Sequence, residues 1–431
     1  MASTANVIRV LFVLTVVCAA SAAATAGPKP TTTAPEAGAG KPVGAGTGET
    51  FDISKLGAVA DGKTDCTKAV MDGWKSACEA AGGGTLLVPK GDFLTGPLNF
   101  GGPCKGPVTF KVDGTLLGST DLKLFPASWI EIKSVDNLLV TGSGTLDGQG
   151  TAVYTKDAGP DKGKLLPKDI NKPLPNTLVL FKVNKASISG IKLLNSKFFH
   201  VNLDSCKDVL IKDISISAPG DSLNTDGIHM GMSTGVTVTN ATIGTGDDCV
   251  SVGAGSSVVN VSQVTCGPGQ GISVGCLGRY KDETDVTGVT VRDSVLRNTT
   301  FGLRIKSYED AEAALTASRL TFENIRMEAV ANPIIIDQYY CPEGVCVPSK
   351  TAPTANTHVS IKDVTFRNIT GTSSTPEAVS LLCSKTMPCS GVELIDVNVQ
   401  YAGKNNKTMA VCNNAKGTAK DSIDAVGCAL V

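Results

Sequence analysis

Short runs that mix aliphatic and polar residues in alternation recur along most of this chain. Examples lie at 137–141, 208–216, 235–243 and 391–399, and such runs are typical of half-buried β-strands. Similar runs lie at 186–193, 286–291, 318–325 and 358–366. Their starts recur every ~22–40 residues, with two gaps near ~50 residues that correspond to two units each. One unit cannot bury its apolar side alone, so the pattern predicts stacked coils.

The repeat favours an all-β fold, a right-handed parallel β-helix of about ten coils. A β-sandwich is the alternative, but it would favour two-residue hairpins with Asn-Gly or Asp-Gly turns. The Asp-Gly pairs that begin at Asp61, Asp113, Asp147 and Asp226 do not join matched strand pairs. We therefore expect a single solenoid domain over residues 49–431.

Residues 64–80 have helical rather than strand periodicity. Their apolar positions form one stripe, which consists of Ala69, Val70, Trp74, Ala77 and Cys78. Thr64 or Asp65 can cap the start of this helix, and the glycines at 82–84 can end it. We expect a short amphipathic helix that covers the open N-terminal end of the solenoid core.

The N-terminus has the pattern of a secretory signal over residues 1–26. Arg9 supplies the positive charge, residues 10–18 form an apolar run that is too short to span a membrane, and small residues follow at 19–26. Residues 27–48 are rich in Gly, Pro, Ala and Thr, which predicts a flexible lead-in. We therefore expect a secreted, extracellular protein without a membrane partner.

Composition limits the ligands that this fold could attract. The 39 basic and 40 acidic residues nearly cancel, which gives a formal net charge of −1. No overall field then draws a polyanion, so any attraction for an acidic ligand must be local. We expect a monomer without a nucleic-acid partner.

The candidate chemistry begins with three carboxylates, Asp226, Asp247 and Asp248. Asp248 follows Asp226 by 22 residues and precedes Gln270 by another 22, which is about one solenoid coil. Residues one coil apart lie side by side on neighbouring strands, ~4.8 Å from each other. We expect these residues to stack on one face of the solenoid.

Clustered carboxylates repel one another, so at least one of them should hold a proton near neutral pH. A protonated and an ionised carboxyl together suit glycoside hydrolysis, in which the first protonates the leaving oxygen and the second activates water. The structural alternative is that these aspartates are ordinary turn residues, since Asp-Gly and Gly-Asp favour turns.

Arg304 and Lys306 are two residues apart, so in a strand their side chains point to the same side. Together they can hold a ligand carboxylate, with the guanidinium bidentate; the alternative is a solvated strand face. Tyr340 can offer its hydroxyl to a sugar or serve packing alone, and His229 can be functional or structural.

Five segments in chain order carry a family resemblance. They are Asn224-Thr-Asp-Gly-Ile-His229, Gly246-Asp-Asp-Cys-Val-Ser251, Cys266-Gly-Pro-Gly-Gln-Gly271, Arg304-Ile-Lys306 and Asp337-Gln-Tyr-Tyr-Cys341. These segments resemble the plant polygalacturonases, pectin-cleaving enzymes of glycoside hydrolase family 28, and are most similar to the grass pollen exopolygalacturonase type, which includes pollen allergens. The resemblance covers about residues 50–430. It implies exo-acting hydrolysis of α-1,4-linked galacturonan of the cell wall, on a right-handed parallel β-helix.

The resemblance also implies a role for each site residue. Asp247 matches the general acid, and Asp226 and Asp248 match the carboxylates that activate water, with inversion at the anomeric carbon. The substrate contacts of the family match Asn224, Arg304, Lys306 and Tyr340. We expect no cofactor and no metal.

At one catalytic position the chain departs from the family pattern. The family's Gly-His-Gly is here Gly269-Gln270-Gly271, and glutamine cannot trade a proton as histidine can. A positioned acid–base group is worth ~10²–10⁴-fold in rate. The alternative function is therefore a weak or silent homologue that binds pectin. Leu223, where the family usually has Pro, is a milder change; a pectate lyase would need a calcium site and an Arg base.

The chain has 14 Cys, one of which lies in the expected signal, and disulfides are expected in a secreted chain. Proximity and the resemblance suggest the pairs Cys78–Cys104, Cys249–Cys266, Cys341–Cys346, Cys383–Cys389 and Cys412–Cys428. Cys66, Cys206 and Cys276 remain, so at least one buried free thiol is expected.

Two further residue types bear on the class of protein. The chain has only three His and no paired C-x-x-C motifs, which argues against a zinc site. His200 and His358 fit packing or surface positions. Sequons at Asn240, Asn260, Asn298, Asn368 and Asn406 fit a secreted glycoprotein.

Overall fold

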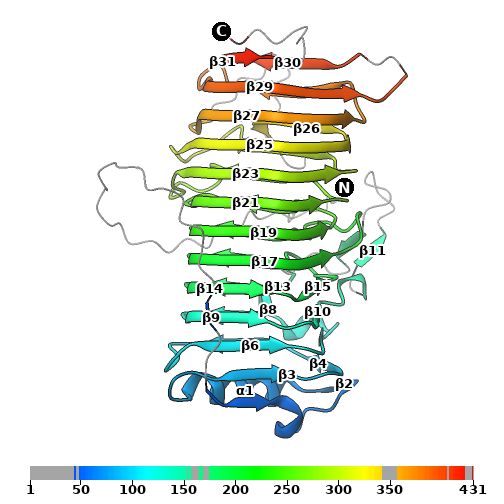
Figure 1. Ribbon diagram of the computed structural model, residues 1–431, viewed down its shortest axis with the longest axis vertical. Coiled ribbons are helices and arrows are strands. Elements are labelled where there is room, and N and C mark those ends of the chain that lie inside the picture. Colours follow the sequence, from blue (N-terminus) through cyan, green and yellow to red (C-terminus); the bar gives the residue numbers. More distant parts are fainter. Residues whose placement is uncertain are drawn as a thin grey trace, which may run out of the picture.

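The computed structural model describes residues 43–44, 48–152, 154–156, 165–167, 174–341, 357–404, 407–422 and 430. The expected signal and most of the expected lead-in lie outside these residues. Within them, strands stack into a tall column with one α-helix at its N-terminal end (Figure 1). None of the described helices is long and apolar enough to cross a membrane.

Strands in the two large sheets pair in parallel with the strands of neighbouring coils. This pairing confirms the parallel β-helix, because a β-sandwich would be built from antiparallel pairs. A small antiparallel pair, β11 (Tyr154–Lys156) and β12 (Leu165–Pro167), lies outside the two sheets.

The first large sheet, which we call the alternating sheet, contains 18 strands. Its shorter strands are β1 (Thr50–Asp52), β2 (Asp61–Asp65), β3 (Thr85–Val88), β4 (Asp92–Thr95), β6 (Val108–Val112), β7 (Thr115–Gly118), β9 (Asp136–Thr141), β10 (Thr145–Asp147), β14 (Asn184–Ser189), β15 (Lys192–Leu194) and β31 (Ala415–Lys420). Its long strands are β17 (Lys207–Ser217), β19 (Thr234–Gly244), β21 (Ser257–Cys266), β23 (Val286–Arg297), β25 (Thr316–Val330), β27 (Ser360–Ser373) and β29 (Cys389–Tyr401). These strands include the alternating runs of the sequence.

The long strands do not alternate strictly, because each bends at a residue in the left-handed conformation. Val238 and Ala241 of β19 both face the core, and Asn240 between them has φ 49°. Asp293 and Asn324 adopt the same conformation in the following coils, at φ 51° and 55°. Asn and Asp tolerate this conformation better than other non-glycine residues, and Asn324 Nδ2 donates to Asp293 Oδ1 at 2.9 Å. The bend lets one strand cover two directions of the coil.

The second large sheet, which we call the site sheet, contains 11 strands. They are β5 (Leu98–Gly101), β8 (Ser128–Lys133), β13 (Asn176–Phe181), β16 (Val201–Asp204), β18 (Ile228–Gly231), β20 (Val250–Val252), β22 (Ile272–Leu277), β24 (Phe301–Tyr308), β26 (Asn332–Tyr340), β28 (Glu377–Leu382) and β30 (Met409–Asn413). In the middle of this sheet both faces are buried. Polar residues therefore occupy buried positions on the outward face.

The helix α1 (Thr67–Glu79) confirms the predicted cap. All five residues of the predicted stripe are buried, and Trp74 stacks on Phe100 with ring centroids 4.4 Å apart. The helix packs against β1, β3, β5 and β6, the first strands of the column. Three 3-10 turns complete the described helices, at η1 (Ile53–Leu56), η2 (Leu122–Leu124) and η3 (Gly150–Ala152).

The predicted start of this helix was three residues too early. Asp61–Asp65 form β2 and pair with β4, so strand pairing takes the residues that could have been the first turn. The N-cap is Cys66, which makes no side-chain cap bond. The Asp65 carboxylate instead accepts the backbone N–H of Thr67 at 2.8 Å. The helix also ends at Glu79, before the glycines.

Three predicted disulfides are present in the described part of the chain: Cys78–Cys104, Cys249–Cys266 and Cys383–Cys389. Cys341 and Cys412 are also disulfide-bonded, and their expected partners Cys346 and Cys428 lie outside the described residues, as does the Asn406 sequon. Cys66 and Cys206 are buried free thiols, as the count of cysteines predicts, and Cys276 is buried.

Candidate active site

The three aspartates converge in turns that precede neighbouring strands of the site sheet. Asp226 precedes β18, and Asp247 and Asp248 precede β20. One carboxylate oxygen from each lies within 4.8 Å of the others. The stacking predicted from the coil spacing is therefore confirmed, and these turn residues form one cluster.

Close packing between two coils makes this convergence possible. A Cβ atom at Gly246 would lie 1.8 Å from the backbone oxygen of Ser222, so only glycine permits this approach. The buried Thr225 Oγ1 accepts the Gly246 N–H at 3.0 Å and lies 2.9 Å from Ser222 Oγ. The Cys249–Cys266 disulfide follows directly after Asp248. The turns that carry the aspartates are thus held from both sides.

Asp248 is the carboxylate with a positively charged partner. Its Oδ2 accepts a hydrogen bond from the Lys306 ammonium at 2.9 Å, and its Oδ1 accepts one from the Ser273 hydroxyl at 2.7 Å. The side chains of Lys306 and Asp248 are only 6% and 2% exposed. Charge-assisted hydrogen bonds of this kind favour the ionised carboxylate. The three aspartates also have the spacing of metal ligands, but Lys306 already supplies a positive charge there.

Asp226 and Asp247 are under the opposite influence. Burial raises the pKa of Asp226 well above its usual range, and repulsion from Asp247 and Asp248 adds to this effect. Burial and the neighbouring Asp248 raise the pKa of Asp247 to about 6, against the influence of Lys306. Asp247 is half-buried, whereas the other two are buried. The cluster thus retains a proton near neutral pH, and Asp247 is its most accessible carboxyl.

Arg304 and Lys306 lie on the same side of β24, as the spacing predicts, and are only 6% and 5% exposed. They do not form a solvated strand face. The Arg304 guanidinium lies 4.0 Å from the Phe301 ring and 5.0 Å from the Tyr340 ring, and Lys306 Nζ lies 5.5 Å from the Tyr340 ring. Arg304 Nη2 is 3.9 Å from Asp337 Oδ2. Its buried Nε has no hydrogen-bond partner among the described residues, so a donor remains for a ligand.

Asn224 and Gln270 both reach the general-acid candidate through their backbones. Asn224, at φ 55°, donates a backbone hydrogen bond that lowers the pKa of Asp247. The Gln270 backbone N–H donates to the Asp247 backbone oxygen at 2.9 Å. The Gln270 side chain is half-buried and makes no hydrogen bond within the described part of the chain. The structure therefore places the backbone of Gln270 next to Asp247, and the side-chain amide forms no hydrogen bond among the described residues.

The model of the glycosyl hydrolases family 28 matches residues 78–423 of this chain. The chain belongs to this family. It is 55% identical to an exopolygalacturonase of Zea mays over 430 residues, 99% of this chain and 100% of the relative. A second Zea mays exopolygalacturonase is 58% identical over 385 residues, 89% of this chain and 91% of the relative. The polygalacturonase structure from Erwinia carotovora matches with a TM-score of 0.64 and 23% identity, over 91% of this chain and 100% of that chain, which shows the shared fold.

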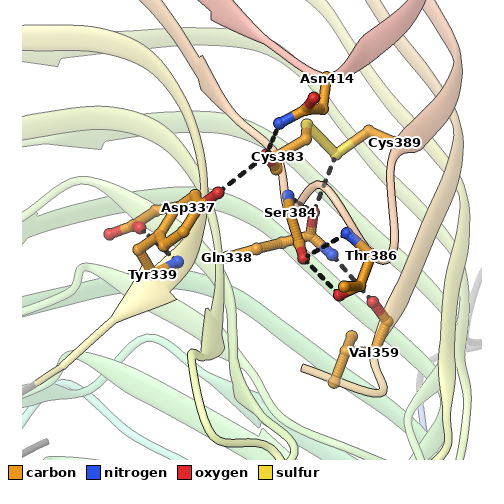
Figure 2. Close-up of a disulfide and its surroundings, with 9 residues drawn as sticks. All are labelled: Asp337, Gln338, Tyr339, Val359, Cys383, Ser384, Thr386, Cys389 and Asn414. Atoms are coloured by element: carbon orange, nitrogen blue, oxygen red, sulfur yellow. Dashed lines mark hydrogen bonds between the residues drawn. A yellow bond between two sulfur atoms is a disulfide. The ribbon is translucent and has the colours of Figure 1, made fainter. Parts of the chain in front are cut away.

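The strand end that carries Tyr340 is fixed by the last coils of this family 28 chain. Figure 2 shows the Gln338 side chain among Val359, Ser384 and Cys389. Its Nε2 donates to Val359 O at 2.9 Å, and its Oε1 accepts the Ser384 N–H at 2.8 Å. The hydroxyl of Tyr339 donates to Cys383 O at 3.3 Å. The Cys383–Cys389 loop thus holds the segment that contacts Arg304.

Sequence reasoning missed two serines, and it allowed a packing role for one histidine, His200. Ser251 and Ser273 each donate to an aspartate 25 residues earlier, and this constant separation is the signal that could have found them. His200, expected at a packing or surface position, is completely buried. Its Nδ1 bonds with the Asp226 backbone oxygen at 3.0 Å, and burial lowers its pKa to about 4. It is a packing residue that holds the Asp226 turn.

Proposed function

We propose that this chain is an exopolygalacturonase that hydrolyses α-1,4-linked galacturonan of pectin. The observation that carries the proposal is the meeting of three carboxylates with Arg304 and Lys306 on one face of the site sheet. The Zea mays relatives carry the name exopolygalacturonase, which supports both the polymer and cleavage from a chain end. Secretion to the cell wall is supported by the expected signal and by the disulfides. We propose that the protein acts as a monomer.

Asp247 is proposed as the general acid. Its raised pKa, about 6, lets it hold a proton in a mildly acidic medium, and its partial exposure lets it reach a glycosidic oxygen. Asp248, which is paired with the Lys306 ammonium, is proposed as the carboxylate that activates water, assisted by Asp226. Activity should then fall as the pH rises through the pKa of Asp247, because the proton needed by the leaving oxygen is lost.

We propose inversion at the anomeric carbon, on the strength of the motif resemblance. The nearest oxygens of the three aspartates lie within 4.8 Å of one another, whereas inverting sites usually separate the two carboxyl groups by ~6.5–9.5 Å and retaining sites by ~5–5.5 Å. The nearest oxygens of three clustered carboxyls are not the separation of one acid from one base, so the product anomer is the deciding observation. Proton NMR of the first product decides: β-anomer supports inversion, whereas initial α-anomer would establish retention and an unsaturated product would establish a lyase.

Arg304 and Lys306 are proposed to bind a galacturonate carboxylate, with Asn224 and Tyr340 as further substrate contacts. The orphaned Arg304 Nε supports this role. Lys306→Ala should weaken binding of polygalacturonate by at least ~10-fold, and binding of its methyl ester by much less, since a charge-assisted bond is lost only in the first case. Exposed Lys362 of β27 offers a control, Lys362→Ala. Equal losses for the two polymers would exclude carboxylate recognition.

The second candidate function is a pectin-binding homologue with little or no turnover, and Gln270 is the observation that favours it. Its backbone N–H bonds with the Asp247 backbone oxygen, and its side-chain amide cannot carry a proton between groups. A reducing-sugar assay with polygalacturonate, beside a binding measurement with pectin fragments, separates the two functions. Turnover by the wild type supports the enzyme, and binding without turnover supports the homologue.

A further inference from the structure

The repeat of the solenoid places two equivalent Asp–Ser pairs side by side. Ser251 Oγ donates to Asp226 Oδ2 at 2.7 Å, and Ser273 Oγ donates to Asp248 Oδ1 at 2.7 Å. Both pairs span 25 residues, and Ser251 and Ser273 are direct partners in the pairing of β20 with β22. The two pairs therefore share their geometry.

The two pairs differ in the further group with which each forms a hydrogen bond. Asp248 also binds the Lys306 ammonium at 2.9 Å. Among the described residues, no cation forms a hydrogen bond with Asp226; instead, Ser251 Oγ lies 2.8 Å from His229 Nδ1. His229 is the register partner of Ser251 on β18 and is 3% exposed. Ser251 Oγ thus bonds with both the buried histidine and the Asp226 carboxylate.

The number of hydrogens available to Asp226, Ser251 and His229 determines which ring nitrogen of the histidine carries a hydrogen. A hydroxyl has one hydrogen, so when Ser251 donates to an ionised Asp226 its oxygen can only accept from Nδ1. His229 must then carry its hydrogen on Nδ1. Burial lowers the pKa of His229 to about 4, so the ring is neutral, and it packs against Phe199 with ring centroids 4.8 Å apart.

We propose that Ser251 and His229 are positioning residues that orient the Asp226 carboxyl and favour its ionised form against the effect of burial, so that it can take part in water activation. This inference rests on the proposed function. Two donors in series, His229 to Ser251 and Ser251 to Asp226, support the negative charge that burial opposes, and each bond strengthens the next. The same bond occupies Asp226 Oδ2, which leaves Oδ1 for water.

The other charged and titratable groups around Asp226 set the conditions of the test. Asp247 and Asp248 on the neighbouring coil raise the pKa of Asp226, and Lys306 on β24 lowers it. On the preceding coil, His200 Nδ1 bonds with the backbone oxygen of Asp226, and its Nε2 accepts the Ser196 N–H. Of these neighbours, Ser251 is the one whose side chain donates a hydrogen bond to the Asp226 carboxylate and lowers its pKa.

The test compares the pH profiles of kcat/KM for Ser251→Ala and Ser273→Ala on polygalacturonate. Loss of a hydrogen bond to a buried carboxylate should raise the pKa of Asp226 by about one unit. The optimum of a bell-shaped profile lies midway between its two apparent pKa values, so it should move up by about half a unit. Ser273→Ala should move it less, because Asp248 retains its contact with the Lys306 ammonium in this variant. Ser251→Thr retains a hydroxyl and should restore the wild-type optimum.

His229→Leu removes the outer donor and should shift the optimum in the same direction as Ser251→Ala, by a smaller amount. If Ser251→Ala lowers Tm or kcat but leaves the optimum where it was, the serine is only structural and the proposal is wrong. Equal shifts for Ser251→Ala and Ser273→Ala would also overturn it. An inactive wild type would instead refute the proposed function, so the two failures are distinguishable.

Discussion

The alternating sheet and the site sheet follow the same coil repeat but bury different residues. On β19 of the alternating sheet, Val236 and Val238 face the core, and Thr237 between them is partly exposed. On β18, β20 and β22 of the site sheet, the outward residues His229, Ser251 and Ser273 are as buried as their apolar neighbours. The first sheet is what hydrophobic burial alone would build.

The site sheet buries polar and charged groups that the stability of the fold alone would not require. Burying polar and charged groups is unfavourable unless they are paired, and the site sheet pairs them with one another: Ser251 with Asp226, Ser273 and Lys306 with Asp248. The alternating sheet keeps its charges at the surface, as in the exposed pair of Arg292 and Asp293. In the turns that precede β18 and β20 of the site sheet, burial raises the pKa values of Asp226 and Asp247.

The largest expected effect would break the chemistry and leave the fold intact. Asp247→Asn should lower kcat by ~10²–10⁴-fold, because an amide cannot protonate the leaving oxygen. Asp293→Asn, in the alternating sheet, is the matched control and should leave kcat unchanged. Both are measured by reducing-sugar release from polygalacturonate. A loss below ~10-fold for Asp247→Asn would show that another group supplies the proton.

The second prediction concerns the stability of the alternating sheet. Phe322 of β25 is completely buried and stacks on Phe366 with ring centroids 5.0 Å apart. Phe322→Ala should reduce the free energy of unfolding by about 3–5 kcal/mol through lost burial and a residual cavity. The kcat of the folded fraction should stay at the wild-type value. Denaturant unfolding and kcat at low temperature check both parts; a fall in kcat would show that the alternating sheet also sets the site geometry.

A third, smaller effect concerns the pH dependence of the free energy of unfolding that arises from Asp247. The pKa of Asp247 is raised from an ordinary value of 3.8 to about 6, so the folded state binds the proton more tightly than the unfolded state. Its contribution is present at low pH and is lost as pH rises through about 6, by at most about 3 kcal/mol. Asp247→Asn should therefore be more stable than wild type at pH 7.5 and gain little at pH 4. Unfolding measured at both values checks this, and a pH-independent difference would contradict it.

The smallest expected effect compares glutamine with histidine at position 270, beside Asp247. Gln270→His restores a titratable ring beside Asp247 and should raise kcat at least ~10-fold, with little change in KM. If wild type already turns over rapidly and the substitution changes nothing, hydrogen bonding is all that this position supplies. If both proteins bind pectin fragments and neither turns over, the hydrolase proposal fails for this chain.

Much of the fold could be predicted because the repeat is local in sequence. Alternating aliphatic residues, one helical stripe and a coil step near 22 residues led to the stacked parallel strands and the cap. The bends in the long strands were missed, although Asn240 and Asn324 interrupt the alternation at matching positions. The start of the cap helix was also missed, because pairing of β2 with β4 competes with it.

The sequence by itself determined which residues could meet: Asp226, Asp247 and Asp248 by their spacing, and Arg304 with Lys306 by strand alternation. The surroundings of each carboxyl come only from the tertiary structure. Asp248 is paired with Lys306, which lies 58 residues later in the chain and reaches it at 2.9 Å. Asp226 and Asp247 have raised pKa values because neighbouring coils exclude water from them. Proximity follows from a periodic chain, whereas protonation depends on burial and on partners that no local pattern encodes.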